Sequence, residues 1–421
     1  MNVLKLLLEK IDQKKERMVQ IRRHLHQHPE LSFEEENTAK FIEDFYKDVP
    51  VDKLETNFGG QRGIIATIKG IKASGQQHSS HNNRNKGKTI LLRADFDALP
   101  VTEKTGLAYS SQNPGIMHAC GHDAHTAYML ILAESLAEIK DLLSGEIRIL
   151  HQPAEETPPG GALAMINAGC LEGVDLVFGI HLRADIETGH IICHPGNTQA
   201  GQSIFKLIIQ GKGGHAASPH LSNDPIVAGS SFVTNLQTIV SRRVNPFEMT
   251  VITVGSFDGA GQFNIIKDSV ILEGDVRTMN EETQRLIEKE FRQLVAGLEV
   301  TFNVKIQLDY SNNYPVLKND PESTRQVKEI CERTSGLNSN QINQDEILIP
   351  EITKVETGNP WSASEDFALY LQKRPGCYFY VGAMPEDGIW HPHHSPRFQI
   401  DERSMIISAK SMAAIVCEYC G

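Results

Sequence analysis

The feature that most constrains the fold of this 421-residue chain is an alternation of strand-like and helical segments that breaks off midway and later resumes. In chain order, the first segments are strands at 63–69 and 88–94, a helix at 121–139, a strand at 146–151, a helix at 161–168 and a strand at 174–181. Hydrophobic periodicity predicts these elements, and their alternation is typical of an α/β layer on a mostly parallel sheet. The same rhythm resumes near Asp320.

The residues between these two parts follow a different order of elements. They are predicted to form a strand at 203–210, a helix at 225–242, strands at 249–257 and 269–277, a helix at 280–298 and a strand at 300–308. The order β-α-β-β-α-β is that of the ferredoxin-like arrangement. We therefore predict one α/β domain formed by residues 1–196 and 312–421, with a small α+β domain, residues 197–311, inserted into it.

The N-terminal part is predicted to contain two helices and a polar loop. Residues 3–28 have the periodicity of a single amphipathic helix. Ser32 is a favourable N-cap residue and Glu35 follows at capping-box spacing, so a second helix is predicted to begin at Ser32. Residues 72–87 are polar and lack periodicity, and we interpret them as a mobile hairpin loop with solvated histidines.

Composition disfavours several classes of function. Lys and Arg number 41 against 53 Asp and Glu, and this net charge of −12 disfavours binding to nucleic acid. No apolar run approaches the roughly 20 residues of a membrane span, and the charged first ten residues do not resemble a signal peptide. Seven cysteines are too sparse for a disulfide scaffold, so we expect a reducing, cytoplasmic location.

Five short segments collect carboxylates, imidazoles and a thiol in a chain that has 17 histidines. They are Arg93–Pro100, His118–His125, Gln152–Glu156, Gly179–Arg183 and His391–Phe398. Several of them follow directly after a predicted strand, which is where open α/β sheets place their sites. Cys120 and His122, at the start of a helix, are ligand types suited to zinc or a neighbouring transition metal.

Each segment alone also has an ordinary structural interpretation. Asp95 and Asp97 fit a chain turn, His181 alone is more typical of a core or turn histidine, and His125 fits a structural role or one behind the metal ligands. Read together, the segments provide more ligands than one tetrahedral ion needs, which favours two ions about 3.5–4 Å apart. Glu155 and Glu156 follow a proline, so both can turn toward one site, one binding metal and one acting as general base.

The five segments resemble the motifs of the dinuclear metallo-aminoacylase and carboxypeptidase superfamily. These motifs are Arg-Ala-Asp-x-Asp-Ala-Leu-Pro, His-x-Cys-Gly-His-Asp, Gln-Pro-Ala-Glu-Glu, Gly-x-His and His-His-Ser-Pro-x-Phe, in this order. The most similar branch contains hippurate hydrolases, auxin-conjugate amidohydrolases and N-acyl-amino-acid deacylases, and the cysteine motif is specific to it. The resemblance covers nearly the whole chain. It implies metal ligands at Cys120, His122, Glu156, His181 and His394.

The resemblance also implies roles in catalysis. Glu155 would be the general base, taking a proton from metal-bound water and passing it to the departing amine. Sulfur has spare lone pairs, so we hypothesise that the Cys120 thiolate bridges the two ions. Asp97 would orient a metal ligand from behind.

In relatives, the inserted domain is a lid whose residues reach the substrate. The matching residues here are His215, Asn264 and Arg277, although each alone is more typical of a structural residue. Arg277 suits a substrate carboxylate, since a guanidinium binds a carboxylate through two hydrogen bonds, and His215 suits the oxyanion. Asn264 is followed by Ile-Ile-Lys-Asp, a departure from the Asn-Val-Ile-Pro expected in relatives. The resemblance further implies a homodimer formed through the lid.

The leading interpretation is a metal-dependent hydrolase that cleaves the amide bond of N-acyl amino acids or of small dipeptide-like substrates. Thiolate, imidazole and carboxylate ligands are compatible with two ions of zinc, manganese, cobalt or nickel. The alternatives are a dedicated N-acetyl-diaminopimelate-type deacetylase, a non-catalytic metal-binding protein on the same scaffold and a structural-zinc protein. Glu155 beside Glu156 disfavours the non-catalytic protein. Cys417 and Cys420 have zinc or redox spacing, but no second pair lies nearby in the sequence.

Overall fold

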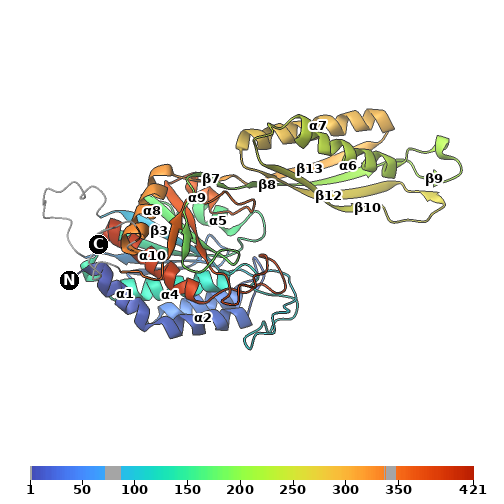
Figure 1. The fold of residues 1–421 in the computed structure, drawn as a ribbon. Helices are drawn as coiled ribbons and strands as arrows, with labels where there is room; N and C mark the ends of the chain where they lie inside the picture. The colour runs from blue at the N-terminus through green and yellow to red at the C-terminus, as the bar shows by residue number, and fades with distance from the viewer. Residues whose placement is uncertain (1, 72–86, 336, 338–347) are drawn as a thin grey trace. The chain divides into compact units, whose positions relative to one another are not determined.

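The computed structural model describes residues 2–71, 87–335, 337 and 348–421 (Figure 1). The segment predicted as a polar hairpin loop, residues 72–87, lies outside the described residues except for Gly87. The chain forms two compact units. The first comprises Met1–Gly196, Asn319–Asn359 and Leu369–Gly421, and the second comprises Asn197–Lys318 and Pro360–Ala368.

The first unit is built on an eight-stranded sheet in the order β1-β2-β4-β3-β5-β16-β6-β15. Its strands are β1 Lys53–Phe58, β2 Gly63–Lys69, β3 Thr89–Asp95, β4 Glu146–Gln152, β5 Leu176–Arg183, β6 His190–Ile192, β15 Lys354–Glu356 and β16 Gly376–Gly382. The central strands β4, β3, β5 and β16 are parallel neighbours, and β1, β2 and β6 add antiparallel pairs. The predicted α/β class with a mostly parallel sheet is confirmed.

Helices cover this sheet, and among them α4 packs against α1, α2 and α10 (Figure 1). The helices are α1 Val3–Gln13, α2 Lys15–Gln27, α3 Glu36–Tyr46, α4 His122–Ala137, α5 Gly161–Asn167, α8 Pro321–Ser335, α9 Ala368–Leu371 and α10 Arg403–Cys420. Every residue of α4 except Glu134 is buried, because α4 packs on β3 on one side and on α2 and α10 on the other. Among the described residues, no helix is long and apolar enough to cross a membrane.

Two expectations for the N-terminal part were wrong. The single helix predicted over 3–28 is broken at Lys14, because α1 packs mainly on α10 and α2 on α4. The next helix begins at Glu36 and not at Ser32, whose hydroxyl instead donates to Asp97 at 2.8 Å. The seven cysteines are free thiols, in line with the absence of a predicted disulfide scaffold.

The second unit contains a four-stranded antiparallel sheet in the order β10-β12-β8-β13, with two helices packed on it. In chain order its main elements are β8 Gly201–Gln210, α6 Pro225–Arg242, β10 Thr250–Asp258, β12 Ser269–Thr278, α7 Glu281–Phe302 and β13 Lys305–Tyr314. This is the predicted β-α-β-β-α-β order. Phe205, Phe232 and Phe291 form the centre of its core. Short paired strands complete the chain: β7 Gly196–Gln199 with β14 Leu317–Asn319, and β9 Gly214–His215 with β11 Ile265–Ile266.

Local signals explain where the two long helices of this unit begin. The Asp224 carboxylate accepts from the N–H groups of Ile226 and Val227, and the Asn280 side chain accepts from that of Glu282. The predicted end of α7 was too early, since the helix runs to Phe302 and stops where Asn303 adopts φ 50°. Helical geometry thus overrides the strand preference of the β-branched residues near position 300.

A buried ion-pair network joins α2 to the start of α4. The Arg22 side chain is 2% exposed, and it donates to Asp123 and to Glu402, each at 3.0 Å. His26 Nδ1 lies 2.9 Å from the same Asp123 oxygen. Burial alone would raise the pKa of Asp123, but Arg22 and His26 hold it well below its ordinary value. The Asp123 carboxylate is therefore charged, and Arg22 is the main group that compensates its buried charge.

Replacing Arg22 with alanine should lower the free energy of unfolding by roughly 3–5 kcal/mol, because it leaves a buried charge without its main partner. Arg23 is the matched control, since its side chain is 48% exposed and bonds to Glu402 but not to the buried Asp123. Arg23→Ala should cost at most about 1 kcal/mol. Urea unfolding of both variants measures the difference, and equal losses would show that the buried network is not a special source of stability.

Candidate metal centre

The candidate site forms where the carboxyl ends of β3, β4 and β5 meet the start of α4. Because these strands are parallel neighbours, the residues at their ends lie along one edge of the sheet. Asp97 follows β3, Glu155 and Glu156 follow β4, and His181 lies in β5. His122 is the first residue of α4. The fold thus brings together segments that are far apart in the sequence.

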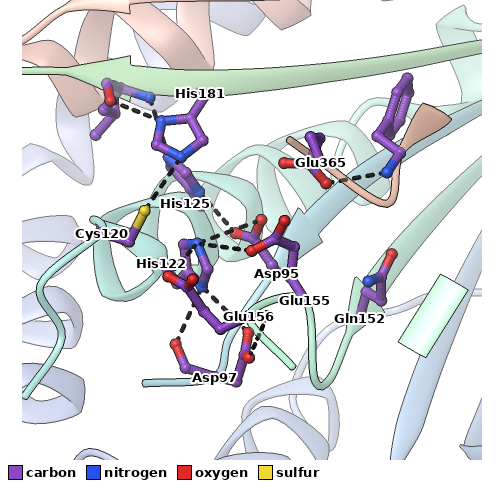
Figure 2. A network of polar contacts seen from close by, with 12 residues as sticks. Asp95, Asp97, Cys120, His122, His125, Gln152, Glu155, Glu156, His181 and Glu365 are labelled. Carbon is purple, nitrogen blue, oxygen red and sulfur yellow. Dashed lines mark hydrogen bonds and ion pairs between the residues drawn. The ribbon is translucent and has the colours of Figure 1, made fainter. Parts of the chain in front are cut away.

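Two groups of three candidate ligands share the Cys120 sulfur. Figure 2 shows four of these ligands, Cys120, His122, His181 and Glu156. The first is Cys120, His122 and His181, and the second is Cys120, Glu156 and His394; within each group the ligand atoms lie within 4.8 Å of one another. The Cys120 Sγ atom is 3.4 Å from His181 Nε2, and His394 Nε2 is 3.3 Å from the Glu156 carboxylate. All five residues that the resemblance implies as ligands therefore converge.

Backbone and carboxylate groups orient the two buried imidazoles. His122 Nδ1 donates to the carbonyl oxygen of Asp97 at 3.0 Å and lies 3.1 Å from its carboxylate, and His181 Nδ1 donates to the Leu182 carbonyl at 2.7 Å. In both rings this leaves Nε2 as the atom available to a metal. Among the described residues, the buried atoms His122 Nε2 and Glu156 Oε1 have no hydrogen-bond partner. Two such orphaned ligand atoms fit a bound cation.

Burial and nearby carboxylates shift the pKa values of two candidate ligands, Cys120 and His122. Burial raises the pKa of the Cys120 thiol, and the neighbouring Glu156 and Glu155 carboxylates raise it further. Burial lowers the pKa of His122, but Asp95 and Asp97 outweigh this effect and raise it to about 10. Both shifts hold protons on groups that ligate a metal only after losing them. A divalent cation that binds here would therefore displace the protons held by Cys120 and His122.

The turn after β4 presents the two glutamates. Ala154 has φ 53°, a left-handed conformation that a residue with a Cβ rarely adopts. Glu155 is 6% exposed. One of its carboxylate oxygens lies within 4.8 Å of a ring nitrogen of His122 and of a carboxylate oxygen of Glu156 (Figure 2). The Glu156 N–H donates to the Asp97 carboxylate at 2.9 Å. Strained backbone of this kind is concentrated at functional sites.

Two nearby residues were not singled out as site residues from the sequence. Asp95, considered only as a chain-turning residue, pairs with Arg93 and lies 2.6 Å from His125 Nδ1. It is thus a partner of His125, which lies behind the ligands. His393 Nδ1 lies 3.6 Å from the Cys120 sulfur. The doubled histidine at 393–394 was the available signal, but the sequence does not say which ring turns inward.

The three predicted substrate residues lie in the second unit, on two different parts of it. His215 in β9 pairs with Ile265 in β11, next to Asn264, so these two residues share one short ribbon. Arg277 lies near the other end of the neighbouring ten-residue strand β12. Its guanidinium donates to Asp275 at 2.7 Å and to the Ser364 hydroxyl at 2.5 Å. Arg277 therefore already has an acidic partner within its own unit.

The chain is similar in sequence to known hydrolases. The model of peptidase family M20/M25/M40 matches residues 91–418. The N-acetyl-L-cysteine deacetylase of Bacillus subtilis strain 168 is 39% identical over 389 residues, which cover 92% of this chain and 85% of that protein. The similarity thus includes both units and all five motif segments.

Solved structures agree with this relationship. A protein from methicillin-resistant Staphylococcus aureus is 50% identical, with a TM-score of 0.85 and full coverage of both chains. The YxeP protein of Bacillus subtilis, described as a dinuclear metal-binding peptidase of the M20 family, is 28% identical with a TM-score of 0.75, covering 96% of this chain and 98% of that one. By motifs, sequence and fold alike, the chain belongs to peptidase family M20/M25/M40.

Proposed function

We propose that the chain is a metal-dependent amidohydrolase that cleaves the amide bond of N-acyl amino acids or of small dipeptide-like substrates. The observation that carries this proposal is a buried carboxylate, Glu155, placed beside two ligand groups that share Cys120. A site that only stores metal has no need of the additional carboxylate. The deacetylase relative from Bacillus subtilis supports an N-acyl amino acid as substrate.

Two divalent ions are the proposed cofactors, and zinc, manganese, cobalt and nickel all suit the donor set. Cys120, His122, Glu156, His181 and His394 would hold the ions, and the Cys120 sulfur belongs to both candidate ligand groups. When bound, the ions polarise the substrate carbonyl as Lewis acids and make a water molecule acidic enough to lose a proton near neutral pH. The relative described as dinuclear supports the number of ions.

The chain's own side chains move the proton and hold the ligands in place. Glu155 accepts the proton of the attacking water and delivers it to the departing amine nitrogen. Asp97 supports the ligands without binding a metal itself: it orients the His122 ring and accepts a hydrogen bond from the backbone N–H of Glu156. One carboxylate thereby fixes both an imidazole ligand and the turn that carries the base.

The lid, which we place at residues 197–311, is proposed to complete the substrate site. His215 would donate to the oxyanion, Asn264 would contact the substrate, and Arg277 would bind the carboxylate of the amino acid through two hydrogen bonds. Asp275 and Ser364 bond to Arg277, so a substrate carboxylate would have to compete for it. We further propose that the lid joins two copies of the chain in a homodimer and that the protein acts in the cytoplasm.

A panel of N-acyl amino acids tests the proposed function. Protein loaded separately with each of the four metals should release the free amino acid from hippurate or from N-acetyl amino acids, and a chelator should abolish this release without unfolding the protein. Release confined to N-acetyl-diaminopimelate would identify a dedicated deacetylase. Inactivity over the whole panel with two ions bound would contradict the proposal and favour a metal-binding protein. Unfolding on chelation would indicate structural zinc.

A further inference from the structure

The turn at 153–156, which carries the proposed base, is held by two buried carboxylates that belong to other segments. The Ala154 N–H donates to Glu35 Oε1 at 2.8 Å. Two residues later, the N–H of Glu156 donates to Asp97 Oδ2 at 2.9 Å. The sequence led us to expect that Asp97 orients a metal ligand, but neither its bond to this turn nor that of Glu35 was predicted.

The far side of the turn is closed by Gly161, the first residue of α5. Its N–H donates to the carbonyl oxygen of Ala154 at 3.0 Å. A Cβ atom at position 161 would lie 2.0 Å from the Pro153 carbonyl oxygen, so only glycine allows this close approach. Both polar groups of Ala154 are therefore bonded, one to Glu35 and one to Gly161. These two bonds hold Ala154 in its left-handed conformation.

The Glu35 side chain forms no capping hydrogen bond with α3, the helix that follows it. The first amides of α3 are capped by Glu30, whose carboxylate accepts from Asn37 N–H at 3.1 Å and from Thr38 N–H at 2.7 Å. Glu35 is fully buried, and its second oxygen has no hydrogen-bond partner among the described residues. Burial, together with the nearby Asp97 charge, raises the pKa of Glu35 to about 7. Burying this group is costly, and among the described residues Ala154 is its one hydrogen-bond partner outside its own segment.

We propose that Glu35 is a positioning residue that fixes the Ala154 peptide and, through it, the direction of the Glu155 carboxylate. The inference rests on the proposed role of Glu155 as general base. A base must lie within hydrogen-bond reach of the proton that it removes, and a displacement of about 1 Å can cost on the order of 100-fold in rate. Ala154 directly precedes Glu155, so a change in its backbone angles would redirect the Glu155 side chain.

The test compares three substitutions at Glu35. Glu35→Gln keeps the acceptor oxygen and the volume, so kcat should stay within about threefold of wild type. Glu35→Met has a similar volume but no acceptor, and kcat should fall roughly 10- to 100-fold with little change in KM. Glu35→Asp draws the acceptor back by one methylene group and should give a smaller loss in kcat. If the methionine variant does not fold, the aspartate variant provides the comparison.

Glu30→Met is the matched control. It makes the same chemical change in the same segment and removes a helix cap, but the Glu30 carboxylate bonds to Asn37 and Thr38 and not to the 153–156 turn. It should lower the thermal unfolding temperature while leaving kcat within about twofold of wild type. Equal losses of kcat in Glu30→Met and Glu35→Met would mean that any disturbance of this segment reduces activity, and would overturn the positioning role.

Hydrogen exchange separates this inference from the proposed function. In Glu35→Met the Ala154 amide should exchange at least tenfold faster than in wild type, whereas Glu35→Gln and Glu30→Met should leave its exchange unchanged. Unchanged exchange in Glu35→Met would overturn the inference whatever the activities are. Faster exchange in a protein whose wild type hydrolyses no substrate of the panel would support the bond from Glu35 and contradict only the catalytic role of the turn.

Discussion

Replacing Glu155 with alanine should lower kcat by about 10²- to 10⁴-fold while the protein keeps both metal ions. This is the effect expected when a general base is lost and its proton must go directly to solvent. Glu155 is outside both groups of ligands that share Cys120, so its removal leaves those ligands in place. Steady-state kinetics with hippurate or an N-acetyl amino acid, together with metal analysis of the same sample, measures both quantities.

Two outcomes would contradict this assignment. Turnover like that of the wild type would show that another group removes the proton. A fall in kcat accompanied by loss of metal would show that Glu155 is a ligand and not the base. Glu187→Ala is a suitable control, because the Glu187 side chain is 72% exposed and lies at the surface. It should change neither kcat nor metal content.

Replacing Cys120 with alanine should remove both metal ions in one step, since its sulfur belongs to both groups of ligands. The variant should retain fewer than one ion per chain after dialysis. Because the ions supply several kcal/mol of transition-state stabilisation, kcat/KM should fall on the order of 10³-fold or more. Plasma emission analysis and steady-state kinetics measure the two effects.

Cys170→Ala is the matched control for this substitution. Cys170 is also a buried free thiol, but it forms no part of the candidate ligand groups. It should keep two ions and normal activity. If Cys120→Ala lost one ion and kept the other at full occupancy, the sulfur would serve a single ion and the bridging hypothesis would be wrong.

The elements that could be predicted from sequence are those specified by local chemistry. The β-α-β-β-α-β order of the second unit follows from hydrophobic periodicity, and Asp224 and Asn280 cap its helices as short-range signals predict. Strand ends that carry carboxylates and histidines were likewise visible, because parallel strands direct their carboxyl ends to one edge. Local pattern was misleading near position 300, where β-branched residues lie in a helix.

Tertiary partners could not be predicted in the same way. Glu35 has the spacing of a capping-box residue relative to Ser32, yet its carboxylate bonds to Ala154, 119 positions later in the chain. Ser32 in turn bonds to Asp97, 65 positions later. His393 and His394 are chemically identical neighbours, yet His393 Nδ1 lies near the Cys120 sulfur and His394 Nε2 near the Glu156 carboxylate. Such roles depend on contacts between residues that are far apart in the chain, and local sequence patterns do not predict these contacts.

The unequal burial of the two ligand groups has a kinetic consequence. Cys120, His122 and His181 are each at most 7% exposed, whereas the His394 side chain is 54% exposed. An ion held by the first group would be enclosed by buried ligands, whereas one held by Cys120, Glu156 and His394 would have one ligand that is more than half exposed to solvent. We therefore expect the two ions to exchange at different rates, so that a half-loaded protein holds its remaining ion on the buried side.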